Sequence, residues 1–312
     1  MAVDAPIPAR ASLRSAAVLL ALSILIGSVA FTFVKLALEE LSPIGLATGR
    51  VVASALMFTA IVSFTPTRRH PIPKGERWRV LFCGFGGSAG FHILFNLGQE
   101  HVSVAMAAVV MSTMPVMTAL GEVLFLGHRL TRAQMAGLAL TTAGCTVIGV
   151  ASGTGAVGGS SPLGLLVIAI ATAVWAAVSV VTRGLGPAYD SWWLNTPGTL
   201  LGALVMLAIH APHLGEFGEL SLRGWLLVIW LGTASSAFIY FAFARVMTAI
   251  SATTAMSVST IVTPLSMLVA WIALDDPPGP VEVVAGAVVI AGVIIVGRRE
   301  VAPTPLEPAP VP

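Results

Sequence analysis

The sequence contains about ten stretches of roughly 20 apolar residues, separated by short polar breaks. A bilayer core about 30 Å thick takes roughly 20 helical residues. Continuous runs of this length favour helices over the shorter, alternating strands of a membrane β-barrel. The sequence therefore predicts an all-α membrane protein with ten transmembrane helices. The expected spans are 14–38, 44–64, 78–99, 103–126, 132–151, 163–183, 192–210, 224–245, 251–274 and 281–297.

The composition argues against several other classes of protein. With 56% hydrophobic and 10% charged residues and a mean hydropathy of +0.94, the chain is far too apolar for an ordinary water-soluble enzyme. A net charge of only +2 offers no basic surface for nucleic acid. Cys83 and Cys145 are too few for a disulfide framework or a zinc site. The expected partners are membrane lipid and a small-molecule substrate, without cofactor or metal.

The basic residues predict how the chain is oriented. Lys and Arg are retained on the cytoplasmic side of a membrane. If the N-terminus is inside, thirteen of the sixteen fall on the cytoplasmic side, and the outer side keeps only Lys35, Arg50 and Arg223. The first apolar run meets Lys35 instead of a small-residue cleavage site, so it is interpreted as a retained helix. We expect a multi-pass protein of the bacterial inner membrane with both termini cytoplasmic.

The chain resembles itself at a shift of 148 to 149 residues. This shift pairs Pro115 with Pro264 and equals five predicted helices. Because five is odd, the second copy would enter the membrane from the other side, which predicts two inverted five-helix repeats. The expected parts are a first repeat at 1–151, a Gly/Ser linker at 152–162, a second repeat at 163–298 and a Pro-rich C-terminal tail at 299–312.

Several segments resemble a known family. They are GSVAFTFVKLAL in the first span, LSPIGLATGR before the second and LFLGHRLT after Pro115, with WAAVSVVTR and the Pro264 segment as the second copy. In these segments the chain resembles the ten-helix, EamA-type transporters of the drug/metabolite transporter superfamily, and within it the YddG-like aromatic amino-acid exporters. His128 departs from the pattern, since such proteins often carry Glu there. The resemblance implies a metabolite carrier.

Pro115 and Pro264 are expected to interrupt corresponding helices near the substrate site and to act as hinges. Proline cannot donate to the carbonyl four residues earlier, so Met111 and Thr260 would keep partly free C=O groups at bilayer depth, able to accept from an ammonium group. The alternative is that both prolines merely kink their helices, with neighbouring hydroxyls satisfying the backbone.

Four polar residues, Ser88, His92, Asn96 and Gln99, form one stripe on the third span. Polar groups at bilayer depth are costly, so the stripe should line a cavity or a helix contact. The repeat shift maps His92 to Tyr240 and Ser88 to Ser236, which predicts that His92 and Tyr240 face one central space. The alternative is a hydrogen-bonded, structural His92.

The sixth span adds Trp175 and Ser179 on one stripe, and Trp175 lies too deep for an interfacial belt. Phe95 and Met111 would supply adaptable apolar walls, although either is equally a core residue. The complete expected set of substrate-binding residues is His92, Tyr240, Trp175, Asn96, Ser88, Ser236, Ser179, Met111, Thr260 and Phe95.

These features predict a carrier that exports small metabolites by alternating access, with neutral or aromatic amino acids as the favoured cargo. Freed carbonyls and Tyr240 would accept from the amine, and His92, Asn96 or Trp175 would donate to the carboxylate. No Lys or Arg is expected near the midplane, which argues against phosphorylated sugars. Glu122, near a helix end, is the only acid well inside a span, so facilitated diffusion is favoured over a proton-coupled exporter of other metabolites or drugs.

Two motifs suggest other functions. GGSAG at 86–90 places Ser88 and His92 on one face, as in a serine hydrolase, but the strand-to-helix elbow and oxyanion hole are missing. We interpret Gly84, Gly87 and Gly90 as a ridge for close helix packing. GTGAVG at 153–158 fits a dinucleotide pattern without the strand that such a site needs. A non-transporting membrane scaffold is the remaining alternative.

Overall fold

The computed structural model describes residues 12–64, 72–102, 107, 110–153, 161–185, 189–274 and 279–298. Within these ranges every regular element is a helix, in agreement with the predicted all-α class. The expected linker at 152–162 lies largely outside the described residues, and the tail at 299–312 wholly so. The motif at 153–158 also lies outside them, apart from Gly153.

The helices of the first half of the chain follow the predicted spans, but two spans are divided. The third is divided by a π-helical turn, η2 (Gly86–Gly90), and the fourth by a break just before Pro115. The helices are α1 (Leu13–Ala37), α2 (Pro43–Phe64), α3 (Arg77–Phe85, after the 3-10 turn η1, Lys74–Glu76), α4 (Phe91–Glu100), α6 (Met114–Leu126) and α7 (Arg132–Gly153).

The second half repeats this pattern. A π-helical turn, η6 (Thr233–Phe238), divides the eighth span, and a break at 260–261 divides the ninth. The helices are α8 (Pro162–Leu185), α9 (Ser191–His210, followed by the 3-10 segment η5, Ala211–Gly218), α10 (Leu222–Gly232), α11 (Ile239–Val246), α12 (Ala252–Ser259), α13 (Val262–Leu274) and α14 (Pro280–Arg298).

Length and composition indicate a membrane protein. Large apolar side chains stand exposed on the outer faces of the helices, among them Leu124 (66% exposed) and Ile272 (86%), as expected of surfaces that face lipid. That ten spans cross, with both termini inside, stays a prediction. Within the described ranges, six helical segments are long and apolar enough to cross a bilayer: Leu13–Ala37, Pro43–Phe64, Lys74–Glu100, Pro162–Leu185, Ser191–Gly218 and Leu222–Val246.

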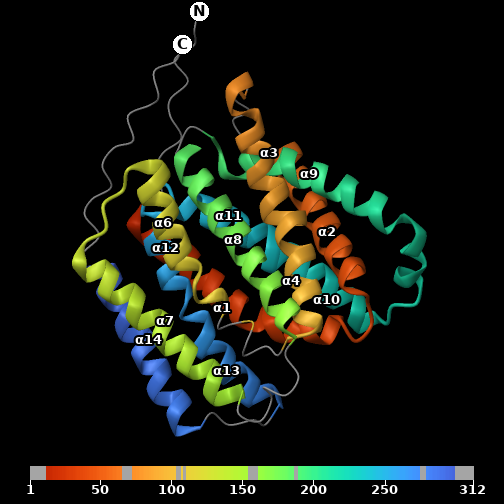
Figure 1. Ribbon diagram of the computed structural model, residues 1–312. Helices are drawn as coiled ribbons and strands as arrows, with labels where there is room; N and C mark the ends of the chain where they lie inside the picture. Colours follow the sequence, from red (N-terminus) through yellow and green to blue (C-terminus); the bar gives the residue numbers. More distant parts are fainter. Residues whose placement is uncertain are drawn as a thin grey trace, which may run out of the picture.

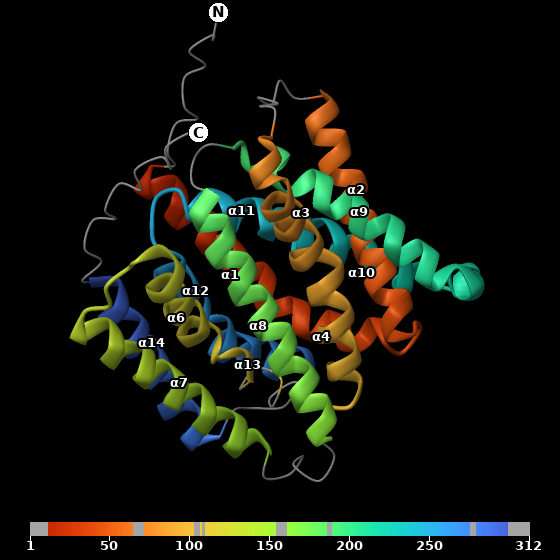
Figure 2. The same cartoon turned by 45° about the horizontal axis from the view of Figure 1, so that its top comes forward.

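The helix contacts are the same when the two halves are exchanged. Helix α1 packs against α11 and α13, while its counterpart α8 packs against α4 and α6. Likewise α2 packs against α10, and α9 against α3. Two counterpart pairs, α2 with α9 and α7 with α14, pack directly on each other, and the α7–α14 pair lies side by side in Figures 1 and 2. A two-fold relation between the halves produces this set of contacts.

Glycines make a close contact between α3 and α9. A Cβ atom at Gly84 of α3 would lie 2.6 Å from the carbonyl oxygen of Asn195 and 2.7 Å from the Cα of Gly198, both in α9. The predicted packing ridge is therefore confirmed at Gly84. At Gly87 and Gly90 an added Cβ would make only ordinary contacts, at 3.5 Å or more. Small residues let backbones approach, which favours helix association in a membrane.

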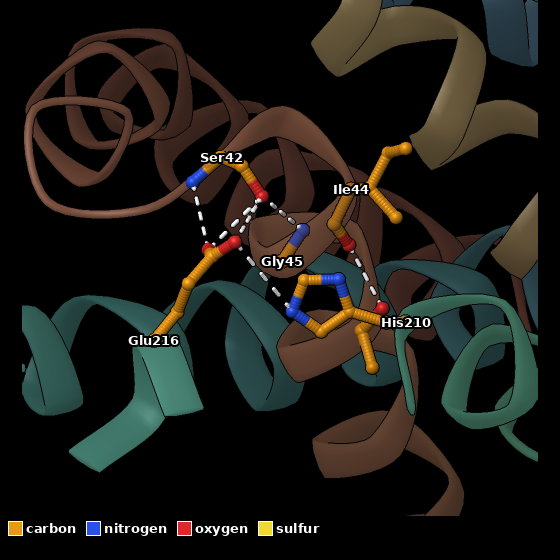
Figure 3. Close-up of polar contacts among 6 residues, drawn as sticks. Ser42, Ile44, Gly45, His210 and Glu216 are labelled. Atoms are coloured by element: carbon orange, nitrogen blue, oxygen red, sulfur yellow. Dashed lines mark hydrogen bonds and ion pairs between the residues drawn. The ribbon is translucent and has the colours of Figure 1, made fainter. Parts of the chain in front are cut away.

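A carboxylate from the chain after α9 holds the first turn of α2. In Figure 3 the Glu216 carboxylate accepts hydrogen bonds from the backbone N–H (3.1 Å) and hydroxyl (2.9 Å) of Ser42. The Ser42 hydroxyl oxygen in turn accepts from the N–H of Gly45, and His210 lies 3.9 Å from Glu216. These contacts satisfy N–H groups that a helix start leaves free. They also fix the end of α2 that precedes Arg50.

Glu122 makes a similar contact deeper in the protein. It is 1% exposed, and its carboxylate accepts from the N–H groups of Ala252 (3.0 Å) and Thr253 (2.9 Å) and from the Thr253 hydroxyl. Because these donors belong to the first turn of α12, the carboxylate compensates the positive end of that helix. Glu122 therefore ties α6 to α12.

We expect Gly84→Ala to destabilise the protein by about 1–3 kcal/mol, because the new methyl group must push α3 away from α9. Gly90→Ala, on the same span, is the matched control and should leave stability nearly unchanged. Thermal unfolding in detergent can be followed with a thiol-reactive dye, since Cys83 and Cys145 are both buried and free. Equal melting temperatures for the two variants would contradict the close contact.

Candidate functional site: a cavity between the two halves

Two π-helical turns, η2 and η6, occupy corresponding positions and present corresponding residues. Each turn consists largely of small residues, GGSAG and TASSAF, and is followed at the second position of the next helix by His92 or Tyr240. The wider turn frees backbone carbonyls, and a serine hydroxyl reaches back to one: Ser236 donates to the Leu231 oxygen at 2.8 Å. Such turns re-aim the side chains that follow them.

The structure places His92 and Tyr240 in direct contact. The Tyr240 hydroxyl lies 2.6 Å and the Ser236 hydroxyl 2.9 Å from His92 Nε2. Tyr240 also donates to the Gly87 oxygen at 2.6 Å. Each hydroxyl has one hydrogen, which it gives to a backbone carbonyl, so His92 Nε2 is the donor toward both hydroxyl oxygens. The His92 tautomer that fits carries its proton on Nε2 and leaves Nδ1 as an acceptor.

His92 and Tyr240 border a cavity of about 170 Å³. Because a cavity needs only about 10–15 Å³ of such volume to hold one water molecule, this one can hold a small solute. Segments from both halves contribute, and ten of the lining residues can form hydrogen bonds: Ser23, Arg50, His92, Ser112, Trp175, Ser235, Tyr240, Ser259, Thr260 and Thr263.

Aromatic rings form one continuous wall of the cavity. The Trp175 ring centroid lies 5.2 Å from those of Phe91 and Tyr240, and Phe91 stacks on Phe95 at 5.4 Å. Phe243 meets the Trp175 ring edge-on at 6.3 Å. Ring pairs at these separations hold each other in fixed orientations. The wall can therefore accept a flat or apolar side chain without rearranging.

The divided helices α6 and α13 meet the cavity at their breaks. Pro115 lies in the first turn of α6, and Met111, Pro115 and Thr260 all line the cavity. The prediction of a partly free carbonyl at Thr260 is wrong, because this oxygen accepts from the Thr263 N–H at 3.0 Å. A new helix starts beside each proline. The first N–H groups of a helix have no partner within that helix, so the absence of a proline N–H removes no helical hydrogen bond there.

Five predicted residues do not line this cavity. The Ser88 hydroxyl donates to the Gly84 oxygen, and the Asn96 amide donates to the Pro43 oxygen at 3.3 Å. Ser236 is hydrogen-bonded to His92 Nε2 but does not line the cavity. Ser179 lines a smaller pocket, which Trp175 and Tyr240 also line. Pro264 follows Thr263 in the chain, and only Thr263 of the two lines the cavity. The predicted burial of the polar stripe is confirmed, since its four side chains are at most 1% exposed.

Sequence reasoning missed Arg50, which it assigned to the outer side of the membrane. The side chain is only 3% exposed and borders the cavity, and its Nη2 atom donates to the Ser236 hydroxyl at 3.4 Å. The argument against phosphorylated sugars therefore did not take account of a buried cation beside the cavity. A signal was available: Arg50 falls two helical turns inside α2, and a charge within a span indicates a functional site.

The geometry offers no support for a hydrolase. A serine nucleophile needs its hydroxyl within hydrogen-bond reach of the histidine base. Here Ser88 bonds a backbone carbonyl of its own helix, and His92 Nε2 bonds Ser236 and Tyr240. The GGSAG motif instead forms the π-helical turn that orients His92.

A polytopic helical protein whose two halves enclose a cavity lined by broken helices has the architecture of a membrane carrier. The EamA-like transporter family matches the chain twice, over residues 14–150 and 162–298. The chain belongs to this family, as its segments suggested. It is therefore a membrane transporter and not an enzyme.

Individual relatives cover nearly the whole chain. A "Probable terminal-alkyne amino-acid exporter" of Streptantibioticus cattleyicolor is 25% identical over 90% of this chain and 92% of its own length. An "Uncharacterized transporter" of Archaeoglobus fulgidus is 26% identical over 90% and 98%. The "Uncharacterized transporter YdfC" of Bacillus subtilis is 25% identical over 90% of both. One solved crystal structure shares the fold, with a TM-score of 0.74 and 21% identity over 91% and 96%.

We expect Tyr240→Phe to lower stability by about 1–3 kcal/mol, because it removes the donor to the buried Gly87 carbonyl and leaves His92 Nε2 with Ser236 as its one remaining acceptor. The other tyrosine of the chain provides the control. Tyr189→Phe removes a hydrogen bond to the partly exposed Glu76, which water can replace, so the loss should stay below about 1 kcal/mol. Thermal unfolding in detergent measures both. A Tyr240 variant as stable as the wild type would contradict the network.

Proposed function

We propose that this protein exports small neutral amino acids, aromatic ones among them, across the bacterial inner membrane by facilitated diffusion. One observation carries the proposal: the cavity combines a wall of aromatic rings with the hydrogen-bonded pair His92 and Tyr240, at the place where both broken helices meet. A ligand site typically joins an apolar lining to a few convergent polar groups. The exporter from Streptantibioticus cattleyicolor supports the choice of amino acids.

The exchangeable contacts of the two halves support alternating access as the mechanism. If the halves can trade conformations, the arrangement that closes one side of the cavity can also close the other. Pro115 and Pro264 stand beside the breaks in α6 and α13, where a change of backbone angles costs few helical hydrogen bonds. We assign these prolines to the hinges. The basic residues place both termini in the cytoplasm in this proposal.

The position of Glu122 supports facilitated diffusion over proton coupling. A coupling carboxylate must bind and release a proton as the carrier turns over. Glu122 does not line the cavity, and three donors from the start of α12 hold its carboxylate. Those donors fix the carboxylate at the start of α12, outside the cavity. This observation separates our proposal from a proton-coupled exporter of other metabolites or drugs.

Counterflow tests the proposed activity directly. Proteoliposomes loaded with unlabelled phenylalanine or leucine should accumulate the labelled amino acid transiently above equilibrium, because a carrier exchanges faster than it leaks. Labelled sugars serve as the negative panel, and protein-free liposomes give the background. No overshoot with any amino acid would contradict the proposal and leave a scaffold as the alternative.

The aromatic wall makes a prediction about selectivity. Trp175→Ala should slow phenylalanine counterflow by about tenfold or more, since it removes one large ring contact from the bound side chain. Alanine counterflow should suffer less. Trp271→Ala is the matched control, because Trp271 is 45% exposed on the outer face of α13 and absent from the cavity lining. Equal effects of the two variants would exclude Trp175 from the site.

Coupling is tested by imposing a pH gradient on the same proteoliposomes. We expect the amino-acid concentrations inside and outside the vesicles to become equal, with or without the gradient, because no carboxylate lines the described cavity to carry a proton. Glu122→Gln should keep the same independence of pH gradient while melting at a lower temperature. Gradient-driven accumulation in the wild type, lost in this variant, would establish the proton-coupled alternative.

A further inference from the structure

Arg50 is a buried cation whose hydrogen-bonding capacity is mostly unused. Of its three guanidinium nitrogens, Nη2 makes one long hydrogen bond to Ser236, while Nε and Nη1 are buried without a partner among the described residues. A guanidinium carries its charge at every physiological pH and has no acceptor of its own. Its side chain borders the cavity between the halves.

The described residues supply no negative charge to Arg50. The ion pairs among them are His101–Glu100, His210–Glu216 and Arg223–Glu39. Glu122, the carboxylate buried in the helix bundle, is held by the first turn of α12. A charge at this depth is stable only when it is paired or when it serves an ion or substrate that brings the pair.

We infer that Arg50 binds the carboxylate group of the transported molecule. The inference rests on the proposed function and names the substrate class of the same cavity: small carboxylates that also carry an amino group. The planar fork of Arg matches a carboxylate with two parallel hydrogen bonds. A phosphate ester fits less well, because Arg50 is the only Lys or Arg among the residues that line the described cavity, and a dianion would keep uncompensated charge.

A second unused group suits the amine of the same molecule. His92 donates through Nε2, so its buried Nδ1 is an acceptor, and it has no partner in the described structure. The Ser236 hydroxyl bonds both Arg50 and His92. The unpaired donors of Arg50 and the unpaired acceptor of His92 therefore belong to two side chains that share one hydrogen-bond partner. An α-amino acid likewise carries an acceptor, its carboxylate, and a donor, its ammonium group, on one carbon atom. Its side chain would then lie along Trp175.

The test compares phenylalanine with phenylalaninamide and phenethylamine, which lack the negative charge. In wild-type counterflow, phenylalanine should be transported at least about tenfold faster than either analogue, the factor that one charge-assisted hydrogen bond provides. Arg50→Gln should transport phenylalanine at least about tenfold more slowly and lose this discrimination, and Arg50→Lys should retain part of it. Arg223→Gln, at an exposed cation, is the matched control and should behave as wild type.

The possible outcomes separate this inference from the proposed function. If no amino acid shows counterflow, the proposed function fails. If wild-type protein transports phenylalanine and its amide equally well, only the carboxylate anchor is overturned, whether or not the Arg50 variants fold. If Arg50→Gln elutes from gel filtration as wild type does and keeps the full discrimination, the role of Arg50 is overturned as well.

Discussion

Inside a membrane protein, a buried polar group has no water to bond and must find its partner in the chain. This constraint explains the contacts that hold the helices in place. Glu122 is buried because three donors at the start of α12 receive it, and Glu216 secures the start of α2 through Ser42. The same constraint makes Arg50 exceptional. It is the buried charge without a compensating group among the described residues, and it borders the cavity.

The cavity exists because the helices on either side of it are irregular. Regular helices packed through glycines, as α3 and α9 are at Gly84, leave no space between them. Two π-helical turns and two breaks interrupt this packing at corresponding places in the two halves. The turns aim His92 and Tyr240 toward each other, and the breaks bring backbone next to the cavity. Close packing of the regular helices therefore holds the bundle together, while the π-helical turns and the breaks form the site.

Much of the helical content and part of the site were predictable. The stripe through His92 and the repeat shift to Tyr240 depend only on helical spacing and chain duplication, and the structure brings the two side chains within 2.6 Å. The hydrogen bond to the Thr260 carbonyl was not predictable from proline chemistry alone, because whether a helix kinks or restarts depends on its neighbours. Arg50 was missed because a charge near the end of an apolar run is usually interfacial. Its burial depends on α10 and η6 packing over α2.

The sequence by itself determined the class of protein: its apolar runs require a membrane, their length requires helices, and their repetition predicts two related halves. Only the tertiary structure decided which polar residues face a common space and which merely bond their own backbone. Ser88 and His92 share one helical face, yet one bonds its own helix while the other crosses to the second half. Spacing along a helix states which residues share a face. What lies opposite that face is set by contacts between residues about 150 positions apart.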